Sequence, residues 1–257
     1  MRVFQVENGW SMEHVQMTTR PLPTPAPGQV RLKMCAAALN YRDLIIPKRG
    51  YGKRMQGLPL ILLSDGVGVV DAIGDGVSRV GLGDRACPVF YQTWIAGEPS
   101  NESMLSSLGC EQDGTMSDYM VVPAEGVCHV PSHLSNFEAA TLPTAASHCV
   151  ACFGKRRATE GGDKVLLQGT GGVSLFALQF AKSLGAHVII TSSSDKKLAR
   201  ARELGADETI NYTTDPQWGR SVKAMTDGAG VDHVIEVGGA GTLEQSLRAV
   251  RTGAPSA

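Results

Sequence analysis

The chain has 257 residues, of which 42% are hydrophobic and 19% charged, a composition typical of globular domains. Its 24 basic and 25 acidic residues give a net charge of −1, so there is no basic surplus to bind nucleic acid. The apolar runs are too short to span a bilayer, and the N-terminus has no features of a secretory signal or a transit peptide. We therefore expect a cytoplasmic protein with reduced cysteines and neither membrane nor nucleic-acid partners.

Residues 1–135 consist of short apolar segments separated by proline and glycine, which is typical of strands joined by turns. The segments that predict strands are 1–6, 29–37, 66–74, 83–90 and 117–123. Long helical patterns are few in this half of the chain. We therefore expect it to form a domain of mainly β-structure.

From about residue 160, the chain alternates strands with helices of 10 to 14 residues. The predicted strands are 164–168, 187–193, 208–212 and 231–239, and helices are expected near 173–186, 195–206 and 241–250. This alternation predicts a parallel, doubly wound sheet. The expected fold class is therefore α/β plus β, with the β domain first and a doubly wound parallel sheet second.

A glycine-rich segment, "GTGGVS" at 169–174, lies where the first of these parallel strands meets its helix. It matches the dinucleotide fingerprint G-x-G-x-x-G except that serine replaces the third glycine. Glycines let the backbone approach a diphosphate closely and present N–H groups at the positive end of the helix dipole. A tight turn without a ligand is the alternative. The residues expected to bind the diphosphate are Gly169, Thr170, Gly171, Gly172 and Val173.

The end of the second parallel strand indicates which dinucleotide is preferred. It carries hydroxyl residues at 191–194, followed by Lys196 and Lys197, where NAD-binding sites usually place a carboxylate. Hydroxyl and ammonium groups favour the 2′-phosphate of NADP(H), although Asp195 leaves NAD(H) open. Alternatively, Ser194 only caps the helix and the lysines form its solvated face. We expect NADP(H) over NAD(H), and the candidate contacts outside the turn are Ser192, Lys196, Tyr212 and Gly238.

Several segments together resemble the medium-chain dehydrogenase/reductases, in their zinc-independent, quinone-oxidoreductase-like branch. The matching segments are 25–43, 58–77, 81–86, 167–186 and 203–212. The resemblance implies a GroES-like catalytic domain over 1–135 and a Rossmann dinucleotide-binding domain over 136–257. It also implies hydride transfer between a nicotinamide cofactor and a small carbonyl-conjugated substrate of the enone, quinone or enoyl type.

The resemblance also bears on metal binding. Zinc-dependent members carry a cysteine where this chain has Asn40, and Gly-His-Glu where it has Ser64, Asp65 and Gly66. The lobe that holds four cysteines around a structural zinc offers only Cys110 here. Because zinc requires three or four converging ligands, we expect no zinc, and a zinc-dependent alcohol dehydrogenase is the disfavoured alternative.

Without a metal, a side chain must supply the proton or steady the substrate oxygen. Tyr51 lies at the position that resembles the proton-donating tyrosine of enoyl reductases, and Asn40 and Tyr41 lie near the nicotinamide site of the family. For each tyrosine, packing is the alternative role. The catalytic candidates are therefore Tyr51, Tyr41 and Asn40.

Family members continue beyond a glycine at Gly253 through two more strands and a segment that returns to the catalytic domain. The resemblance therefore implies an incomplete Rossmann domain without the family's usual homodimer edge, and it leaves the strand at 231–239 at the edge of the sheet. We expect this chain to be less stable than a longer one. A weak or inactive dinucleotide-binding protein is the alternative function.

Overall fold

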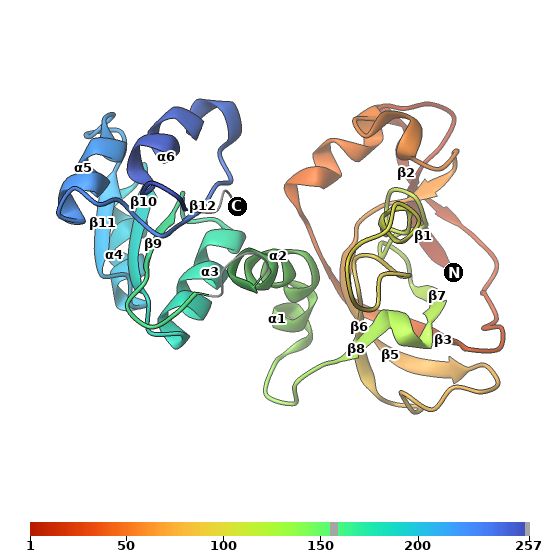
Figure 1. The fold of residues 1–257 in the computed structure, drawn as a ribbon. Coiled ribbons are helices and arrows are strands. Elements are labelled where there is room, and N and C mark those ends of the chain that lie inside the picture. The colour runs from red at the N-terminus through yellow and green to blue at the C-terminus, as the bar shows by residue number, and fades with distance from the viewer. Residues whose placement is uncertain (155–158, 255–257) are drawn as a thin grey trace. The chain divides into compact units, whose positions relative to one another are not determined.

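A computed structural model of the chain describes residues 1–154 and 159–254. The fold divides into two compact units, Met1–Thr144 and Ala145–Ala257 (Figure 1). The short helix α1 (Asn136–Ala140) belongs to the first unit, so this division falls later in the chain than residue 135. Helix α2 (Leu142–Gly154) begins just before the division.

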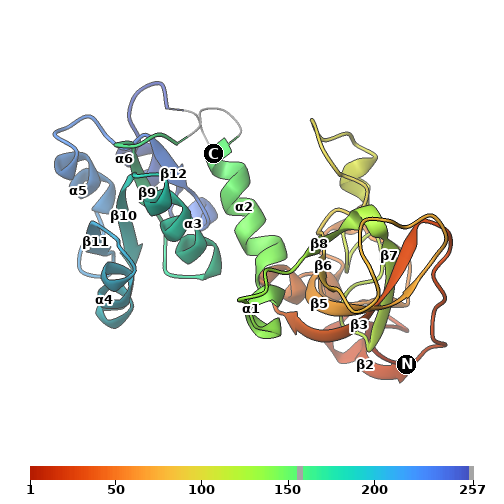
Figure 2. The ribbon, with the colours of Figure 1, turned by 90° about the horizontal axis from the view of Figure 1, so that it is seen from below.

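The first unit is built on antiparallel strands. One sheet has the order β7 (Tyr119–Pro123), β3 (Gln29–Ala38), β5 (Asp65–Ile73), β6 (Arg85–Pro88), β8 (Val127–His129). A second sheet has the order β2 (Val15–Thr19), β1 (Arg2–Val6), β4 (Leu60–Ile61). Figure 2 shows β3 and β5, which pair along most of their length. Val30 and Leu32 alternate with half-exposed residues along β3 and enter the core, as the period of two requires.

Short 3-10 helices connect these strands. They are η1 (Met12–His14), η2 (Tyr41–Leu44), η3 (Ile46–Lys48), η4 (Gly52–Arg54), η5 (Ser103–Leu105) and η6 (Ala124–Gly126). Asn40 and Tyr41 lie at the start of η2, directly after the long strand β3, and Tyr51 lies at the start of η4.

The second unit contains a four-stranded parallel sheet in the order β11 (Glu208–Asn211), β10 (His187–Ser192), β9 (Lys164–Leu167), β12 (His233–Ile235). The helices are α3 (Gly172–Ser183), α4 (Asp195–Glu203), α5 (Trp218–Met225) and α6 (Leu243–Ala249), with the short η7 (Gly239–Gly241) before α6. The predicted parallel sheet is confirmed, and β12 lies at its edge as expected.

Helices cover both faces of this sheet, which explains the uninterrupted apolar strands (Figure 1). Val165 and Leu167 of β9 pack in one cluster with α3 and α4. Leu166, between them, packs in the other cluster with Trp218 of α5 and Ala249 of α6. The predicted fold class, α/β plus β, is therefore confirmed. None of the helices in the described part of the chain is long and apolar enough to cross a bilayer.

Candidate functional site

The glycine turn between β9 and α3 is open on its outer side. Gly169 has φ +70°, in the left-handed region that favours glycine, whereas Gly171 has φ −81° and ψ 179° and caps α3. A Cβ at Gly169 or Gly171 would meet no protein atom within 4 Å, and at Gly172 it would meet only the Ala145 Cβ, at 3.9 Å. The open space above these glycines leaves room for a ligand to approach the backbone.

The N–H groups of this turn are available to an anion. Among residues 1–154 and 159–254, no acceptor receives the N–H groups of Thr170, Gly171, Gly172 or Val173. They lie at the start of the 12-residue helix α3, where its dipole is positive. These four N–H groups suit a diphosphate, whereas the Gly169 N–H donates to the Thr191 hydroxyl. The turn is therefore the candidate anion site, and its binding role stays a prediction.

Serine at the third glycine position has a structural role. The hydroxyl of Ser174 is buried and donates to the main-chain carbonyl of Gln168 at 2.6 Å. This bond joins the first turn of α3 to the end of β9, and the small side chain still lets helix and strand pack closely.

Hydroxyl groups from two strand ends meet beside the turn. The Thr170 and Ser192 hydroxyl oxygens are 3.2 Å apart, and the Ser194 N–H donates to the Ser192 hydroxyl at 3.4 Å. The Gly169 N–H donates to the Thr191 hydroxyl at 3.3 Å. The structure therefore brings Thr170 and Ser192 together, as expected for residues of one site.

The start of α4 is positively charged. The Asp195 carboxylate accepts the Asn211 side-chain N–H at 2.8 Å, so Asp195 is engaged with β11. Lys196 and Lys197 are exposed, and neither forms an ion pair with any other residue that the structure describes. Tyr212 is half exposed, and its main-chain N–H donates to the Ser192 carbonyl at 3.1 Å.

The glycines after β12 differ from those after β9. The Glu236 carboxylate accepts the N–H groups of Gly238 and Gly239, each at 2.9 Å, and the Thr242 hydroxyl at 2.6 Å. Gly238 therefore lies at the expected strand end, but its N–H is used within the protein. Strand β12 ends at Ile235, earlier than predicted, because the following N–H groups turn toward this carboxylate.

The candidate catalytic residues differ in their surroundings. The Tyr41 side chain is 80% exposed, whereas Tyr51 is 40% exposed, with the Arg42 guanidinium 5.9 Å from its ring centre. The Asn40 side-chain nitrogen is buried, and no acceptor in the described part of the chain meets it with hydrogen-bond geometry. Burial raises the pKa of Asp65, and the Thr144 hydrogen bonds and the nearby Asn40 amide oppose that rise.

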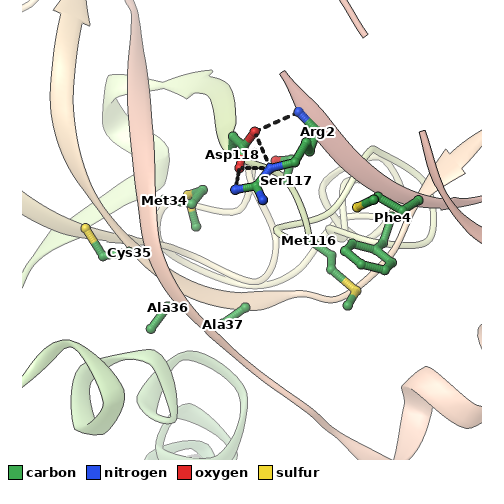
Figure 3. Close-up of a pocket in the computed structure, with 10 residues that line it drawn as sticks. Arg2, Phe4, Met34, Cys35, Ala36, Ala37, Met116, Ser117 and Asp118 are labelled. Carbon is green, nitrogen blue, oxygen red and sulfur yellow. Dashed lines mark hydrogen bonds and ion pairs between the residues drawn. The ribbon is translucent and has the colours of Figure 1, made fainter. Parts of the chain in front are cut away.

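A separate hollow lies in the first unit (Figure 3). Its volume is about 280 Å³, and Phe4, Met34 and Met116 contribute apolar groups to its lining. Arg2 and Asp118 form an ion pair of 2.9 Å within it, and the Arg2 hydrogen bond lowers the pKa of Asp118. None of the three catalytic candidates lines this hollow.

Comparison with known proteins identifies the family. Residues 26–132 match the alcohol dehydrogenase GroES-like domain, and residues 172–256 match a zinc-binding dehydrogenase domain. The crystal structure of a putative alcohol dehydrogenase from Sinorhizobium meliloti 1021 is 36% identical, with a TM-score of 0.89 over 97% of this chain and 73% of that chain. This chain belongs to the medium-chain dehydrogenase/reductase family.

Other medium-chain dehydrogenase/reductases resemble it over most of its length. A zinc-type alcohol dehydrogenase-like protein of Schizosaccharomyces pombe is 47% identical over 223 residues, 86% of this chain and 64% of that protein. A quinone oxidoreductase of Pseudomonas aeruginosa is 33% identical over 88% of this chain and 63% of its own length. A mycobacterial protein solved with NADPH is 26% identical, with a TM-score of 0.80 over 98% of this chain and 71% of that chain. The chain thus spans less than two thirds of these two curated relatives.

Some medium-chain dehydrogenase/reductases use zinc, but the donors at the corresponding positions here do not fit it. Asn40 and Ser64 offer a neutral amide and a neutral hydroxyl, and the Asp65 carboxylate accepts the Thr144 hydroxyl at 2.6 Å and the Thr144 N–H at 3.2 Å. Among the described residues, no three His, Cys, Asp or Glu side chains are grouped so that they could hold a metal. The absence of zinc stays a prediction.

Three polar residues beside the candidate dinucleotide site were not predicted from the sequence. They are Gln168, Glu236 and Ser246, which form one hydrogen-bonded group between β9, β12 and α6. The available signal was a carboxylate directly between an apolar strand and a glycine pair, in "VIEVGG".

Proposed function

We propose that this chain is a zinc-independent, NADPH-dependent oxidoreductase that acts on a small carbonyl-conjugated substrate. The observation that carries the proposal is the open glycine turn with its N–H groups at the start of α3. The turn follows β9, which has β10 on one side in the sheet and β12 on the other. The chain runs first to β10 and later returns to β12, so the direction of strand order changes at β9. In open α/β sheets this switch point is where dinucleotides bind.

The residues present fit the cofactor. Gly169, Gly171 and Gly172 leave open space beside N–H groups that no described residue accepts, and the hydroxyls of Thr170 and Ser192 lie next to them. When bound, the nicotinamide would supply or accept a hydride. The solved relative that holds NADPH supports a cofactor of this class.

The preference for NADPH rests on charge. Asp195 is occupied by Asn211, while Lys196 and Lys197 are exposed on the first turn of α4. A dianionic 2′-phosphate would gain charge-assisted hydrogen bonds from these ammonium groups. A ribose 2′-hydroxyl would gain much less.

The proposed substrate class follows from the donors that the first unit provides. Reduction of a conjugated carbonyl requires one hydride and one proton, and it does not require a metal to generate an alkoxide. Tyr51 carries a phenol that can donate a proton, and the Arg42 guanidinium lies 5.9 Å from its ring centre. Tyr41 is the exposed alternative. The Asn40 amide can donate to a substrate oxygen. The Pseudomonas aeruginosa relative named quinone oxidoreductase supports this class.

The test begins with titration of NADPH and NADH into the purified chain, followed by turnover with enones and quinones. We expect NADPH to bind more tightly, and Tyr51→Phe to lower kcat while leaving the Kd for NADPH unchanged. Tyr119→Phe, which removes a phenol from β7, is the matched control. Binding without turnover by the unchanged chain would favour a non-catalytic dinucleotide-binding protein, and no binding would refute the proposal.

A further inference from the structure

Gln168 links the two strand ends on either side of the switch point. It is the last residue before the glycine turn, and its side chain crosses from the end of β9 to the end of β12. Its Oε1 accepts the main-chain N–H groups of Val237 at 3.3 Å and Gly238 at 3.2 Å. Its Nε2 donates to Glu236 Oε2 at 2.6 Å and also to the Ser246 hydroxyl. All the polar groups of this buried amide are used.

Glu236 is equally saturated. Its Oε1 accepts from Gly238, Gly239 and Thr242, and its Oε2 accepts from Gln168 Nε2 and from the Ser246 hydroxyl at 2.5 Å. Partial burial would raise the pKa of Glu236, but the hydrogen bonds from Ser246, Thr242 and Gln168 hold it below its ordinary value. With five donors around it, this carboxylate is satisfied within the protein.

Gln168 connects this group of residues to the glycine turn. The Gln168 main-chain carbonyl is held by Ser174, and the next residue, Gly169, is held by Thr191. With its side chain also fixed to β12, the residue that begins the turn is anchored on three sides. Glu236 meanwhile occupies the N–H groups of the second glycine pair, which leaves the turn after β9 as the anion cradle of the switch point.

We propose that Gln168 and Glu236 are positioning residues that hold the glycine turn in its ligand-accepting form and thereby set the affinity for the dinucleotide. The proposal rests on the proposed function, because it concerns the same cofactor site. It assigns neither residue a contact with the cofactor or with the reacting atoms. Their effect should therefore be the same for NADPH and NADH.

The donor and acceptor pattern makes the proposal testable. In Glu236→Gln, the new NH2 group must point either at the N–H groups of Gly238 and Gly239 or at the Gln168 NH2. In both arrangements a donor faces a donor, and no hydrogen bond forms between them. Flipping Gln168 only moves the conflict to the N–H groups of Val237 and Gly238.

An exchange of the two side chains removes this conflict. In the double variant Gln168→Glu with Glu236→Gln, the amide carbonyl introduced at position 236 accepts from the glycine N–H groups. The NH2 group of that amide donates to the carboxylate introduced at position 168, and this carboxylate accepts from the Val237 N–H. The exchange therefore restores the pattern of donors facing acceptors.

The experiment measures Kd for NADPH and for NADH by fluorescence titration, together with melting temperature, on the full chain. We expect Glu236→Gln to weaken both cofactors by about tenfold or more, and the exchanged pair to recover most of that loss. Glu244→Gln, which removes an exposed carboxylate that forms an ion pair with Arg248, is the matched control and should leave Kd unchanged.

The outcomes separate the two proposals. Suppose that the unchanged chain binds and that Glu236→Gln has the same Kd but a lower melting temperature. This result would show that the group only stabilises the fold. Failure of the exchanged pair to regain affinity would also overturn the positioning role, even if Glu236→Gln alone did not fold. No binding by the unchanged chain would refute the proposed function and this inference together.

Discussion

Gly171→Ala should separate the folding role of the glycine turn from its binding role. Gly171 has φ −81° and ψ 179°, a conformation that alanine adopts without strain, and its Cβ would meet no protein atom within 4 Å. The variant should therefore fold normally and gain about 0.4–1 kcal/mol in its free energy of unfolding, because the unfolded chain is less flexible. The new methyl group would nevertheless occupy the open space in which the diphosphate is expected.

The loss in binding can be given a magnitude. A displaced charge-assisted hydrogen bond is worth about 1.5–3 kcal/mol, which corresponds to a Kd for NADPH weaker by about 10- to 140-fold. The measurements are NADPH fluorescence titration and urea unfolding. Gly161→Ala, whose Cβ would meet only the Leu184 carbonyl at 3.7 Å, is the control in the same unit. Gly169→Ala should lose both stability and affinity for NADPH, because φ +70° costs alanine about 1–2 kcal/mol. An unchanged Kd in Gly171→Ala would refute the assignment of this turn to the diphosphate.

Three further predictions concern charge, metal and pH. Replacing Lys196 and Lys197 by alanine should weaken NADPH by about 1–3 kcal/mol and NADH little, with Lys223→Ala as control; equal weakening would contradict the NADPH preference. Elemental analysis of the purified chain should find no stoichiometric zinc, and one tightly held zinc per chain would overturn this expectation. Because burial raises the pKa of Asp65 above 3.8, its contribution to stability is complete below that pH and is lost as the pH rises through the raised value. Asp65→Asn should flatten the fall in urea midpoint above about pH 4, and an unchanged slope would contradict this reasoning.

The strands and the glycine turn could be predicted because their signals are local. Apolar runs such as "KVLL" at β9 and the glycines after it report on neighbouring residues only. Strand β4 has only two residues, and β2 is largely exposed, so neither carries a clear pattern. The sequence therefore predicts neither of them.

The candidate site was predictable where it depends on glycine and hydroxyl residues at strand ends, as at Gly171 and Ser192. It was not predictable where it depends on partners far apart in the sequence. Gln168 and Glu236 are 68 positions apart. No local pattern indicates that the amide that follows β9 contacts the carboxylate that follows β12. The roles of Tyr51, Tyr41 and Asn40 stay predictions.

The pairing of β9 with β12 also has a consequence for folding kinetics. Strand β9 can pair with β10 once the connection that contains α3 is in place, whereas pairing with β12 requires residues 68 positions apart to meet. Loop closure of this length is slow relative to local helix formation. We therefore expect the hydrogen bonds from Gln168 to Glu236, Val237 and Gly238 to form later than those that join the turn to Ser174 and Thr191. A ligand that binds only the completed turn would slow unfolding, so protection of the β9 and β12 amides from hydrogen exchange should rise with dinucleotide concentration.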